Sequence, residues 1–278
     1  MSIHPYRTVD VFTAEPLRGN PLAVVFDAEG LSDAQMQAIA RWINLSETTF
    51  LLPPTDAQAD YRVRIFTPGG ELPFAGHPTL GTCHAWLEAG GQPQRQGEVV
   101  QQCGVGLVRI RREAARLAFA APPMRASEVS PAMQRQVLAA LGLQPDQVQA
   151  VQMLDNGPRW LSLLLDSAQT VLSLQPDHRA LAGLAKVGVI GAHAPGGDAQ
   201  FEVRGFVSHA GVPEDPVTGS LNAALAQWLI AHGRAPRRYV AAQGTCLGRA
   251  GRVFIEADEA GVWVGGDTVS CIAGELRV

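Results

Sequence analysis

The sequence predicts an α+β protein built from two similar halves. Short strand-like runs outnumber helical stretches, and the chain repeats itself at an offset of about 140 residues. In the repeat, Val63-Arg-Ile-Phe matches Val203-Arg-Gly-Phe, and Ala85–Gly91 matches Gln227–Gly233. Each copy is a strand, a loop rich in glycine and proline, and then a helix. The duplication predicts a cleft between two halves, with a boundary near residues 120–130.

The predicted strands are short runs that glycine, proline, asparagine or aspartate interrupts. In Tyr61–Ile65 apolar and basic residues alternate, as expected of a strand with one face in a core and one in water. In chain order the predicted strands are Thr8–Phe12, Leu22–Phe26, Thr49–Leu52, Tyr61–Phe66, Leu107–Arg111, Trp160–Asp166, Phe201–Val207, Arg252–Ala257, Val262–Val264 and Thr268–Val278.

Four helices are marked by their starts. The stretch 32–43 opens with Ser32 and Gln35 in capping-box spacing, and apolar residues follow at helical intervals. A second helix follows Ser130, a cap residue with proline after it. The other two begin inside the repeat, at residues 76–79 and 218–220, so we expect them at equivalent places in the two halves.

Composition excludes several classes of function. A formal net charge of −4 gives no electrostatic footprint for nucleic acid, and Lys186 is the single lysine. The four cysteines show no C-x-x-C spacing, which favours reduced thiols and predicts no metal site. The N-terminus does not resemble a signal peptide, and no run of 18 apolar residues occurs. We therefore expect a cytoplasmic protein with no membrane partner.

The two helix starts in the repeat predict a binding site for a carboxylate. Unpaired N–H groups and a partial positive charge at a helix N-terminus attract anions. The first start lies in residues 72–81 and the second in residues 211–220. Two such starts facing one cleft would bind a small anionic molecule.

Four side chains near these starts have both a chemical and a plain structural interpretation. His77 is a proton donor or substrate contact, or else a helix cap. Asp215 binds a ligand amine or hydroxyl, or else closes a turn, and Ser220 binds a carboxylate or caps its helix. Glu47 lies between a helix and a strand, where a lone glutamate is usually solvated. If it is desolvated, its pKa rises and it suits proton abstraction from carbon.

Cysteine and metal chemistry are disfavoured. Cys83 lies inside a predicted helix and Cys246 in a late loop, and we interpret both as small packing residues. A two-thiol racemase would need cysteines at the two helix starts. A metal site from His77, Cys83 and His84 lacks a carboxylate, and its outer members are about two turns apart.

Five segments of the chain form a characteristic set: Gly19–Val25, Asn44–Phe50, Phe74–Gly81, Glu214–Ser220 and Val264–Gly266 with the strands that close the chain. Together they resemble the phenazine-biosynthesis PhzF-like family, whose fold is that of diaminopimelate epimerase. The resemblance implies two pseudo-symmetric domains, each a curved, mostly antiparallel sheet or barrel around a central helix, with the active site between them and no cofactor or metal.

The resemblance also implies roles for six residues. The catalytic positions correspond to Glu47, His77 and Asp215, and the substrate-binding positions to Gly76, Gly219 and Ser220. The glutamate would move a proton between carbon atoms of the substrate. The best-known reaction of the family isomerises trans-2,3-dihydro-3-hydroxyanthranilate. The chain is therefore expected to be a cofactor-independent isomerase of a small carboxylated metabolite, in a biosynthetic process.

On this basis the halves are expected at residues 1–126 and 127–278, with the final strand near 268–278 packed on the first half. Family members are often homodimers, so a homodimer is expected. The stretch Val207-Ser-His-Ala-Gly211 departs from the family's phenylalanine-alanine-proline pattern, and His209 could change what the pocket accepts. Two rival functions stay open: a non-catalytic binder of small carboxylates, and an epimerase or racemase of an amino acid.

Overall fold

The computed structural model describes residues 1–113, 116–208 and 212–278. The chain forms two compact units, one of residues 1–120 and 265–278 (unit 1) and one of residues 121–264 (unit 2). His209, singled out from the sequence, lies outside the described residues.

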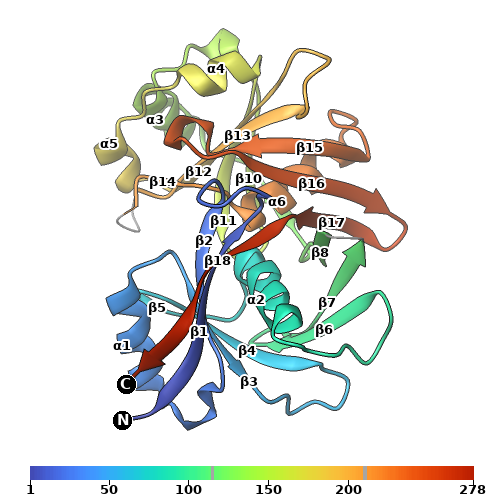
Figure 1. The fold of residues 1–278 in the computed structure, drawn as a ribbon. Coiled ribbons are helices and arrows are strands. Elements are labelled where there is room, and N and C mark those ends of the chain that lie inside the picture. The colour runs from blue at the N-terminus through green and yellow to red at the C-terminus, as the bar shows by residue number, and fades with distance from the viewer. Residues whose placement is uncertain (114–115, 209–211) are drawn as a thin grey trace. The chain divides into compact units, whose positions relative to one another are not determined.

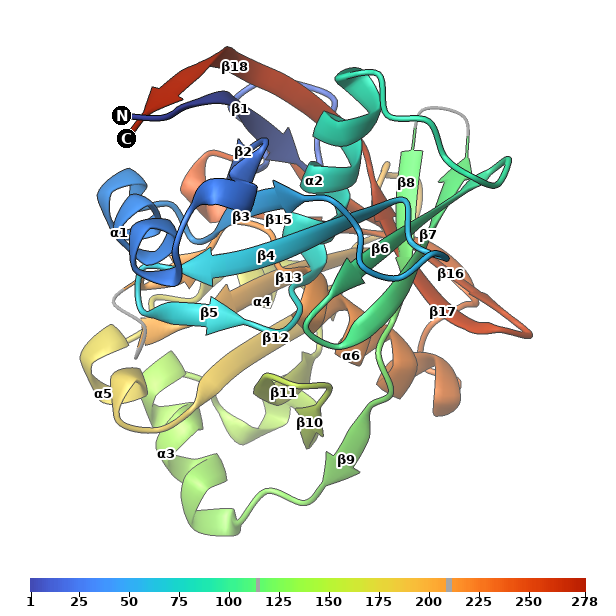
Figure 2. The ribbon, with the colours of Figure 1, turned by 90° about the horizontal axis from the view of Figure 1, so that it is seen from below.

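Unit 1 is a mostly antiparallel sheet curved around a helix. The C-terminal strand β18 pairs with β1, so the two ends of the chain lie side by side (Figure 1). From β1 the pairing continues through β2 to β3 and β4, and from β4 to β5 and β6; β2–β3 and β4–β6 are parallel. Figure 2 shows α2 enclosed by these strands, with α1 outside them. The elements are β1 (Ile3–Val11), β2 (Asn20–Val25), η1 (Ala28–Gly30), α1 (Asp33–Ile43), β3 (Thr48–Leu52), β4 (Tyr61–Thr67), β5 (Gly70–Leu72), α2 (Gly76–Glu88), β6 (Glu98–Cys103), β7 (Gly106–Glu113), β8 (Arg116–Ala120) and β18 (Thr268–Arg277).

Unit 2 repeats this order of pairing. Strand β9 pairs with β10 as β18 pairs with β1, and the parallel pairs β11–β12 and β13–β15 match β2–β3 and β4–β6. The elements are β9 (Arg125–Ser127), α3 (Pro131–Leu141), η2 (Pro145–Gln147), β10 (Val148–Asp155), β11 (Arg159–Leu165), α4 (Ala168–Ser173), α5 (His178–Ala182), β12 (Lys186–Ala192), β13 (Phe201–Phe206), β14 (Glu214–Asp215), α6 (Gly219–Ala231), β15 (Arg238–Gln243), η4 (Thr245–Leu247), β16 (Gly251–Asp258) and β17 (Gly261–Gly266). The predicted α+β class and the internal repeat are confirmed.

The predicted helices form where their local signals place them. Ser32 caps α1 with a capping box to Gln35, and Ser130 caps α3 through the N–H of Met133. The predicted elements do not include the short helices α4 and α5 or the strands β5, β6, β8, β9, β10, β12, β14 and β15. Strands β6, β10, β12 and β15 are each paired on both sides in the structure, so long-range pairing determines these four more than local alternation does.

The central helices α2 and α6 are buried along most of their length, and each is closely packed on its own sheet. A Cβ on Gly81 of α2 would lie 2.6 Å from Leu22 Cδ2 in β2. In unit 2 the small residue is on the strand: a Cβ on Gly188 of β12 would lie 2.2 Å from Leu221 Cδ1 of α6. Close packing of this kind fixes the axial position of each helix and therefore where its N-terminus lies.

Both copies of the repeat contain the same ion pair. In unit 1, Arg64 of β4 makes a bidentate pair with Glu71 of β5 at 2.7 and 2.6 Å. In unit 2, Arg204 of β13 pairs in the same way with Glu214 of β14 at 3.0 and 2.8 Å. In each copy the guanidinium carbon lies 5.0 Å from the ring of the phenylalanine two residues later. The pair fixes the hairpin that precedes each central helix.

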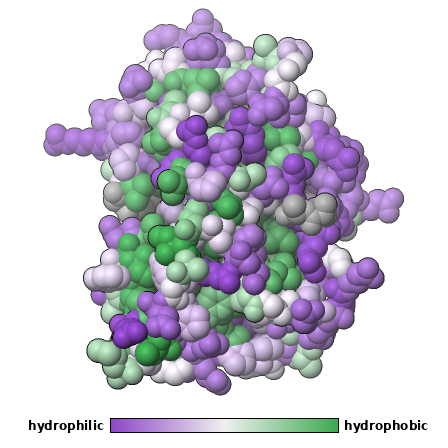
Figure 3. All heavy atoms as spheres, viewed as in Figure 1, coloured by the Kyte–Doolittle hydropathy of each residue, from purple (hydrophilic) through white to green (hydrophobic). Residues whose placement is uncertain are grey.

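The face of the molecule drawn in Figure 3 is mostly hydrophilic, with hydrophobic residues in separate patches. Among the described residues, no helix is both long and apolar enough to cross a membrane.

Candidate active site

In unit 1 the structure brings Glu47 and His77 together. Helix α1 ends at Ile43, the next residue Asn44 adopts φ 58° and turns the chain, and β3 begins at Thr48 beside β2. Glu47 therefore directly precedes a buried strand, and only 16% of its side chain is exposed. His77 is the second residue of α2, with 6% of its side chain exposed. Glu47 Oε2 lies 3.5 Å from His77 Nε2.

His77 is a neutral imidazole at neutral pH. Burial lowers its pKa from 6.5 to about 3, against the opposing effect of a hydrogen bond to the backbone of Pro21. Proline has no N–H, so His77 donates to the Pro21 carbonyl. Among the described residues Nε2 makes no hydrogen bond, so the donor is Nδ1–H, and the Nε2 lone pair faces Glu47. At neutral pH the imidazole can therefore accept a hydrogen bond at Nε2 and is not an acid.

In unit 2, Asp215 belongs to a polar network at the start of α6. Its Oδ2 accepts a hydrogen bond of 2.6 Å from the hydroxyl of Thr218. Gln243 of β15 donates through Nε2 to the Thr218 hydroxyl at 2.9 Å and to the Asp215 carbonyl at 3.2 Å. The Asp215 side chain is only partly buried, so it is fixed in direction but still accessible.

Ser220 does not cap its helix. The residue at the cap position of α6 is Thr218, and Ser220 is the second helical residue. The Ser220 hydroxyl accepts a hydrogen bond from Trp160 Nε1 at 3.3 Å, and its carbonyl accepts one from Asn156 Nδ2 at 2.8 Å. The capping interpretation from the sequence is wrong, because the helix begins at Gly219, two residues earlier than a capping role for Ser220 would require.

The two central helices differ from the others in having no side-chain cap. The residues at the cap positions of α2 and α6 are Ala75 and Thr218, and neither makes a side-chain cap hydrogen bond. The first helical residues are Gly76 and Gly219. The other four α-helices are capped by the side chains of Ser32, Ser130, Ser167 and Asp177. The starts of α2 and α6 therefore keep first-turn N–H groups that no cap side chain occupies, which is the arrangement that binds anions.

The cysteines are not placed for thiol chemistry at the helix starts. Cys83 is completely buried inside α2, and burial raises its pKa to about 12, so its thiol stays protonated. The prediction that Cys83 packs in the interior agrees with this burial. The same prediction for Cys246 is wrong, because Cys246 is exposed in η4. Within the described ranges no group of three or more histidine, cysteine, aspartate or glutamate side chains forms a metal-binding cluster.

Comparisons with known proteins agree with this geometry. The model of the PhzC-PhzF family, described as phenazine biosynthesis-like protein, matches residues 9–274. The chain belongs to this family. It is 37% identical to the trans-2,3-dihydro-3-hydroxyanthranilate isomerase of Pseudomonas aeruginosa over 282 residues, which cover 96% of this chain and 95% of that protein.

Two further matches extend over the whole length of this PhzF-family isomerase. One is antisense-enhancing sequence 1 of Schizosaccharomyces pombe, 37% identical over 294 residues that cover 99% of both chains. The other is the crystal structure of a PhzF-family phenazine biosynthesis protein from Bacillus anthracis, with a TM-score of 0.86 and 22% identity over 100% of both chains. This last likeness establishes the shared fold.

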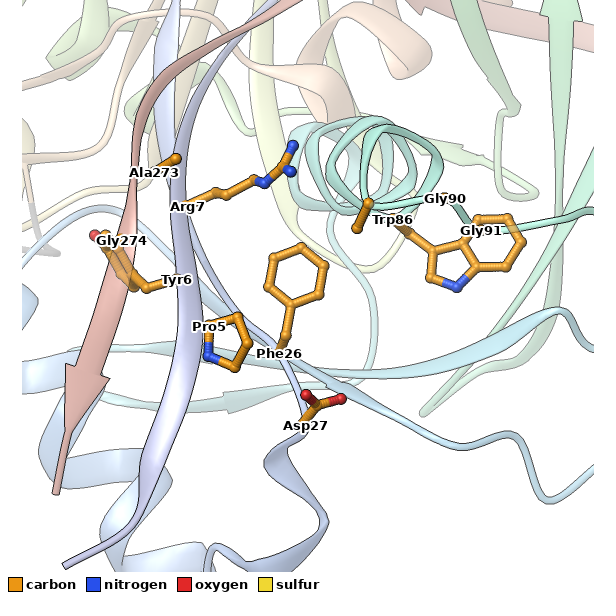
Figure 4. A pocket seen from close by; sticks show the side chains of 11 residues that line it. Pro5, Tyr6, Arg7, Phe26, Asp27, Trp86, Gly90, Gly91, Ala273 and Gly274 are labelled. Atoms are coloured by element: carbon orange, nitrogen blue, oxygen red, sulfur yellow. The ribbon is translucent and has the colours of Figure 1, made fainter.

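The PhzF-family isomerase also has a groove that is separate from these residues. Figure 4 shows it in unit 1, a hollow of about 580 Å³ with Arg7, Phe26 and Trp86 among its lining residues. It lies at the C-terminal end of α2, whereas His77 is at the N-terminal end, about 18 Å along a helix of this length. Arg7 is already paired with Glu88, so the groove offers no free charge to a ligand from this residue.

Sequence reasoning about this PhzF-family isomerase missed three residues around the second helix start. Trp160 and Asn156 hold Ser220, and Gln243 holds Thr218. No local signal identifies them, because they lie at least 21 residues away in the chain from the groups they bind. The pairing of Arg204 with Glu214 had a signal, since the arginine occurs in both copies of the repeat.

Proposed function

We propose that this isomerase moves a proton between two carbon atoms of a small carboxylated metabolite, with Glu47 as the proton carrier. The observation that supports this most directly is the approach of Glu47 to a neutral His77 at 3.5 Å, beside the uncapped start of α2. A carboxylate that is mostly buried next to anion-binding N–H groups would meet a substrate carboxylate and an adjacent C–H together.

The proton transfer needs one group that is first a base and then an acid. Glu47 takes the proton from carbon as a carboxylate. Once protonated, it can donate a hydrogen bond to the Nε2 lone pair of His77, which holds the proton until it returns to a different carbon. A positioned acid or base of this kind typically supplies about 10² to 10⁴ in rate. His77 in this mechanism stabilises the protonated carboxyl.

The substrate carboxylate and its other polar groups would be held at the helix starts. Gly76 and Gly219 supply backbone N–H groups, Ser220 a hydroxyl, and Asp215 an acceptor for an amine or hydroxyl. Binding measurements test the role of each start separately. Ser220→Ala for the start of α6 and His77→Gln for the start of α2 should each weaken binding of a small carboxylate, and unchanged binding would remove that start from the proposal.

The first substrate to test is suggested by the relatives. The Pseudomonas aeruginosa protein is named for trans-2,3-dihydro-3-hydroxyanthranilate, a molecule with a ring carboxylate. We propose this compound, or a metabolite with the same carboxylate and an acidified C–H, as the substrate. A cytoplasmic location and a homodimeric state stay predictions, and sedimentation tests the second.

The deciding experiment is deuterium incorporation from D₂O, followed by mass spectrometry, with a panel of amino and hydroxy acids that includes dihydro-hydroxyanthranilate. We expect label in one compound and a loss of at least about 100-fold in exchange rate for Glu47→Gln. Glu29→Gln is the matched control, because Glu29 is an exposed glutamate in η1. An undiminished exchange rate in Glu47→Gln would remove this residue from the mechanism.

The same experiment separates the rival functions. A carboxylate-binding protein without turnover would bind a panel compound and incorporate no label. A cysteine-dependent racemase would exchange label but would lose the exchange, without losing stability, in a Cys83→Ser, Cys246→Ser protein. Burial and a raised pKa disfavour Cys83 as a nucleophile.

A further inference from the structure

Two buried side chains of the β10–β11 hairpin hold Ser220. Trp160, the second residue of β11, donates its indole N–H to the Ser220 hydroxyl at 3.3 Å. Asn156, between the two strands, donates its amide to the Ser220 carbonyl at 2.8 Å. Trp160 is 2% exposed and Asn156 is 7% exposed, so neither is free to change its direction. The hairpin therefore fixes both the backbone and the side chain at the second residue of α6.

The hydrogen bond from Trp160 determines what the Ser220 hydroxyl can do. An indole N–H is only a donor, so Ser220 Oγ must be the acceptor in this contact. A serine hydroxyl has one O–H to donate, and the contact with Trp160 leaves it unused. Within the described part of the chain, no hydrogen bond has Ser220 Oγ as its donor. The O–H thus stays available to an acceptor outside these hydrogen bonds.

The surroundings of Ser220 indicate which acceptor that is. Ser220 is half-buried, so a ligand can reach it, and it lies in the first turn of a helix that lacks a side-chain cap. Its O–H and the first-turn N–H groups form a set of donors. Such a set favours an anionic acceptor, because hydrogen bonds to a charged oxygen are roughly twice as strong as neutral ones.

Lys186 helps to keep the indole in place. Its ammonium nitrogen lies 5.7 Å from the centre of the Trp160 ring, within the range of a cation–π attraction. Lys186 is the first residue of β12, and Trp160 and Lys186 are directly paired across β11 and β12. The ring is thus held by burial and by a neighbouring cation, and its N–H has one direction.

We propose that Trp160 is a positioning residue that makes the Ser220 hydroxyl a dedicated donor to the substrate carboxylate. Because Ser220 Oγ accepts from the indole, its O–H is presented to the ligand together with the first-turn N–H groups, and these donors bind a charged carboxylate more strongly than a neutral amide. This inference rests on the proposed function, because it assumes that Ser220 contacts the substrate.

The test is the Trp160→Phe variant, which keeps a buried aromatic ring but removes the N–H together with part of the indole ring system, a loss of volume that the Trp263→Phe control shares. We expect KM for the substrate to rise about tenfold while kcat stays within about twofold, because a binding hydrogen bond is weakened and the proton carrier is untouched. Trp263→Phe is the matched control: Trp263 is 4% exposed and its indole donates at 3.3 Å to Asp258, so it loses a comparable bond elsewhere in unit 2. An unchanged KM in a folded Trp160→Phe protein would overturn the proposal.

A second readout separates this role from a merely structural one. Binding of anthranilate and of anthranilamide, measured by calorimetry, should favour the carboxylate in the unmodified protein, and Trp160→Phe should reduce that preference while Trp263→Phe keeps it. In a Ser220→Ala background, Trp160→Phe should have no additional effect on the preference. Equal affinity for the two probes in the unmodified protein would refute the inference. Absence of deuterium exchange in the unmodified protein would instead refute the proposed function.

Discussion

The repeated arginine–glutamate pair allows the cost of a buried charge to be measured within one chain. Arg204 and Glu214 have side-chain exposures of 6% and 4%, whereas Arg64 and Glu71 have exposures of 26% and 41%. The geometry is the same, so the environment is the main difference. Glu214→Gln keeps the size of the side chain and removes its charge, and Glu71→Gln does the same in unit 1.

The expected magnitudes follow from what each arginine keeps. After Glu214→Gln, the Arg204 guanidinium keeps its hydrogen bonds to the carbonyls of Val171 and Leu174 at 3.2 and 2.9 Å. Its positive charge, however, loses the Glu214 carboxylate and is too buried for water to replace it. Leaving a buried charge uncompensated costs about 3–5 kcal/mol of unfolding free energy. After Glu71→Gln, Arg64 keeps Asp33 at 2.6 Å and its contact with water. An exposed pair contributes about 0–1 kcal/mol.

The assay is urea unfolding at pH 7, followed by tryptophan fluorescence, of the unmodified protein and the two variants. The sequence contains five tryptophans, of which Trp160, Trp228 and Trp263 are in unit 2 and report its unfolding directly. We expect a large decrease in the unfolding free energy for Glu214→Gln and a small one for Glu71→Gln. Equal effects, or a cost below about 1 kcal/mol for Glu214→Gln, would refute the reasoning that burial decides the strength of this pair.

Two further predictions concern stability. Burial lowers the pKa of His77 from 6.5 to about 3. Between these pH values the unfolded chain binds a proton at this residue and the folded chain does not. The contribution of His77 to the unfolding free energy is therefore complete above pH 6.5 and decreases as the pH falls toward 3. Between pH 7 and pH 5 the unfolding free energy of His77→Gln should therefore decrease by about 2 kcal/mol less than that of the unmodified protein. Urea unfolding at each pH measures this difference. Equal decreases in the two proteins would contradict the effect of burial on the His77 pKa. Gly191→Ala should cost about 1–3 kcal/mol, because its Cβ would lie 2.2 Å from the Ser167 carbonyl oxygen, whereas a Cβ on Gly197 meets only an oxygen at 3.7 Å; thermal unfolding of both alanine variants checks this difference, and equal melting temperatures would contradict it.

The local signals in the sequence were sufficient for a large part of the fold. Ser32 and Ser130 cap the helices that follow them, because a cap depends on neighbouring residues alone. The repeat around Val63 and Val203 indicated the duplication, because both copies keep the strand and the last turn of the central helix. The motif segments gave the family, which the match over residues 9–274 confirms.

Other properties depend on contacts between residues far apart in the chain. Strand β18 reaches β1 across the whole sequence, and strands such as β12 and β15 form through pairing with partners that local alternation does not reveal. Cys246 is exposed although its sequence surroundings predicted packing. Burial is a sum over distant neighbours, so a local pattern cannot supply it.

The chemistry of the candidate site divides in the same way. The sequence by itself determined which residue types are present at the helix starts: Glu47, His77, Asp215 and Ser220. Only the tertiary structure decided that Glu47 and His77 lie 3.5 Å apart and that His77 is neutral, because desolvation lowers its pKa more than the hydrogen bond to Pro21 raises it. The sequence determines the identity of a residue, but the groups that surround it in the folded protein determine its protonation state and the orientation of its side chain.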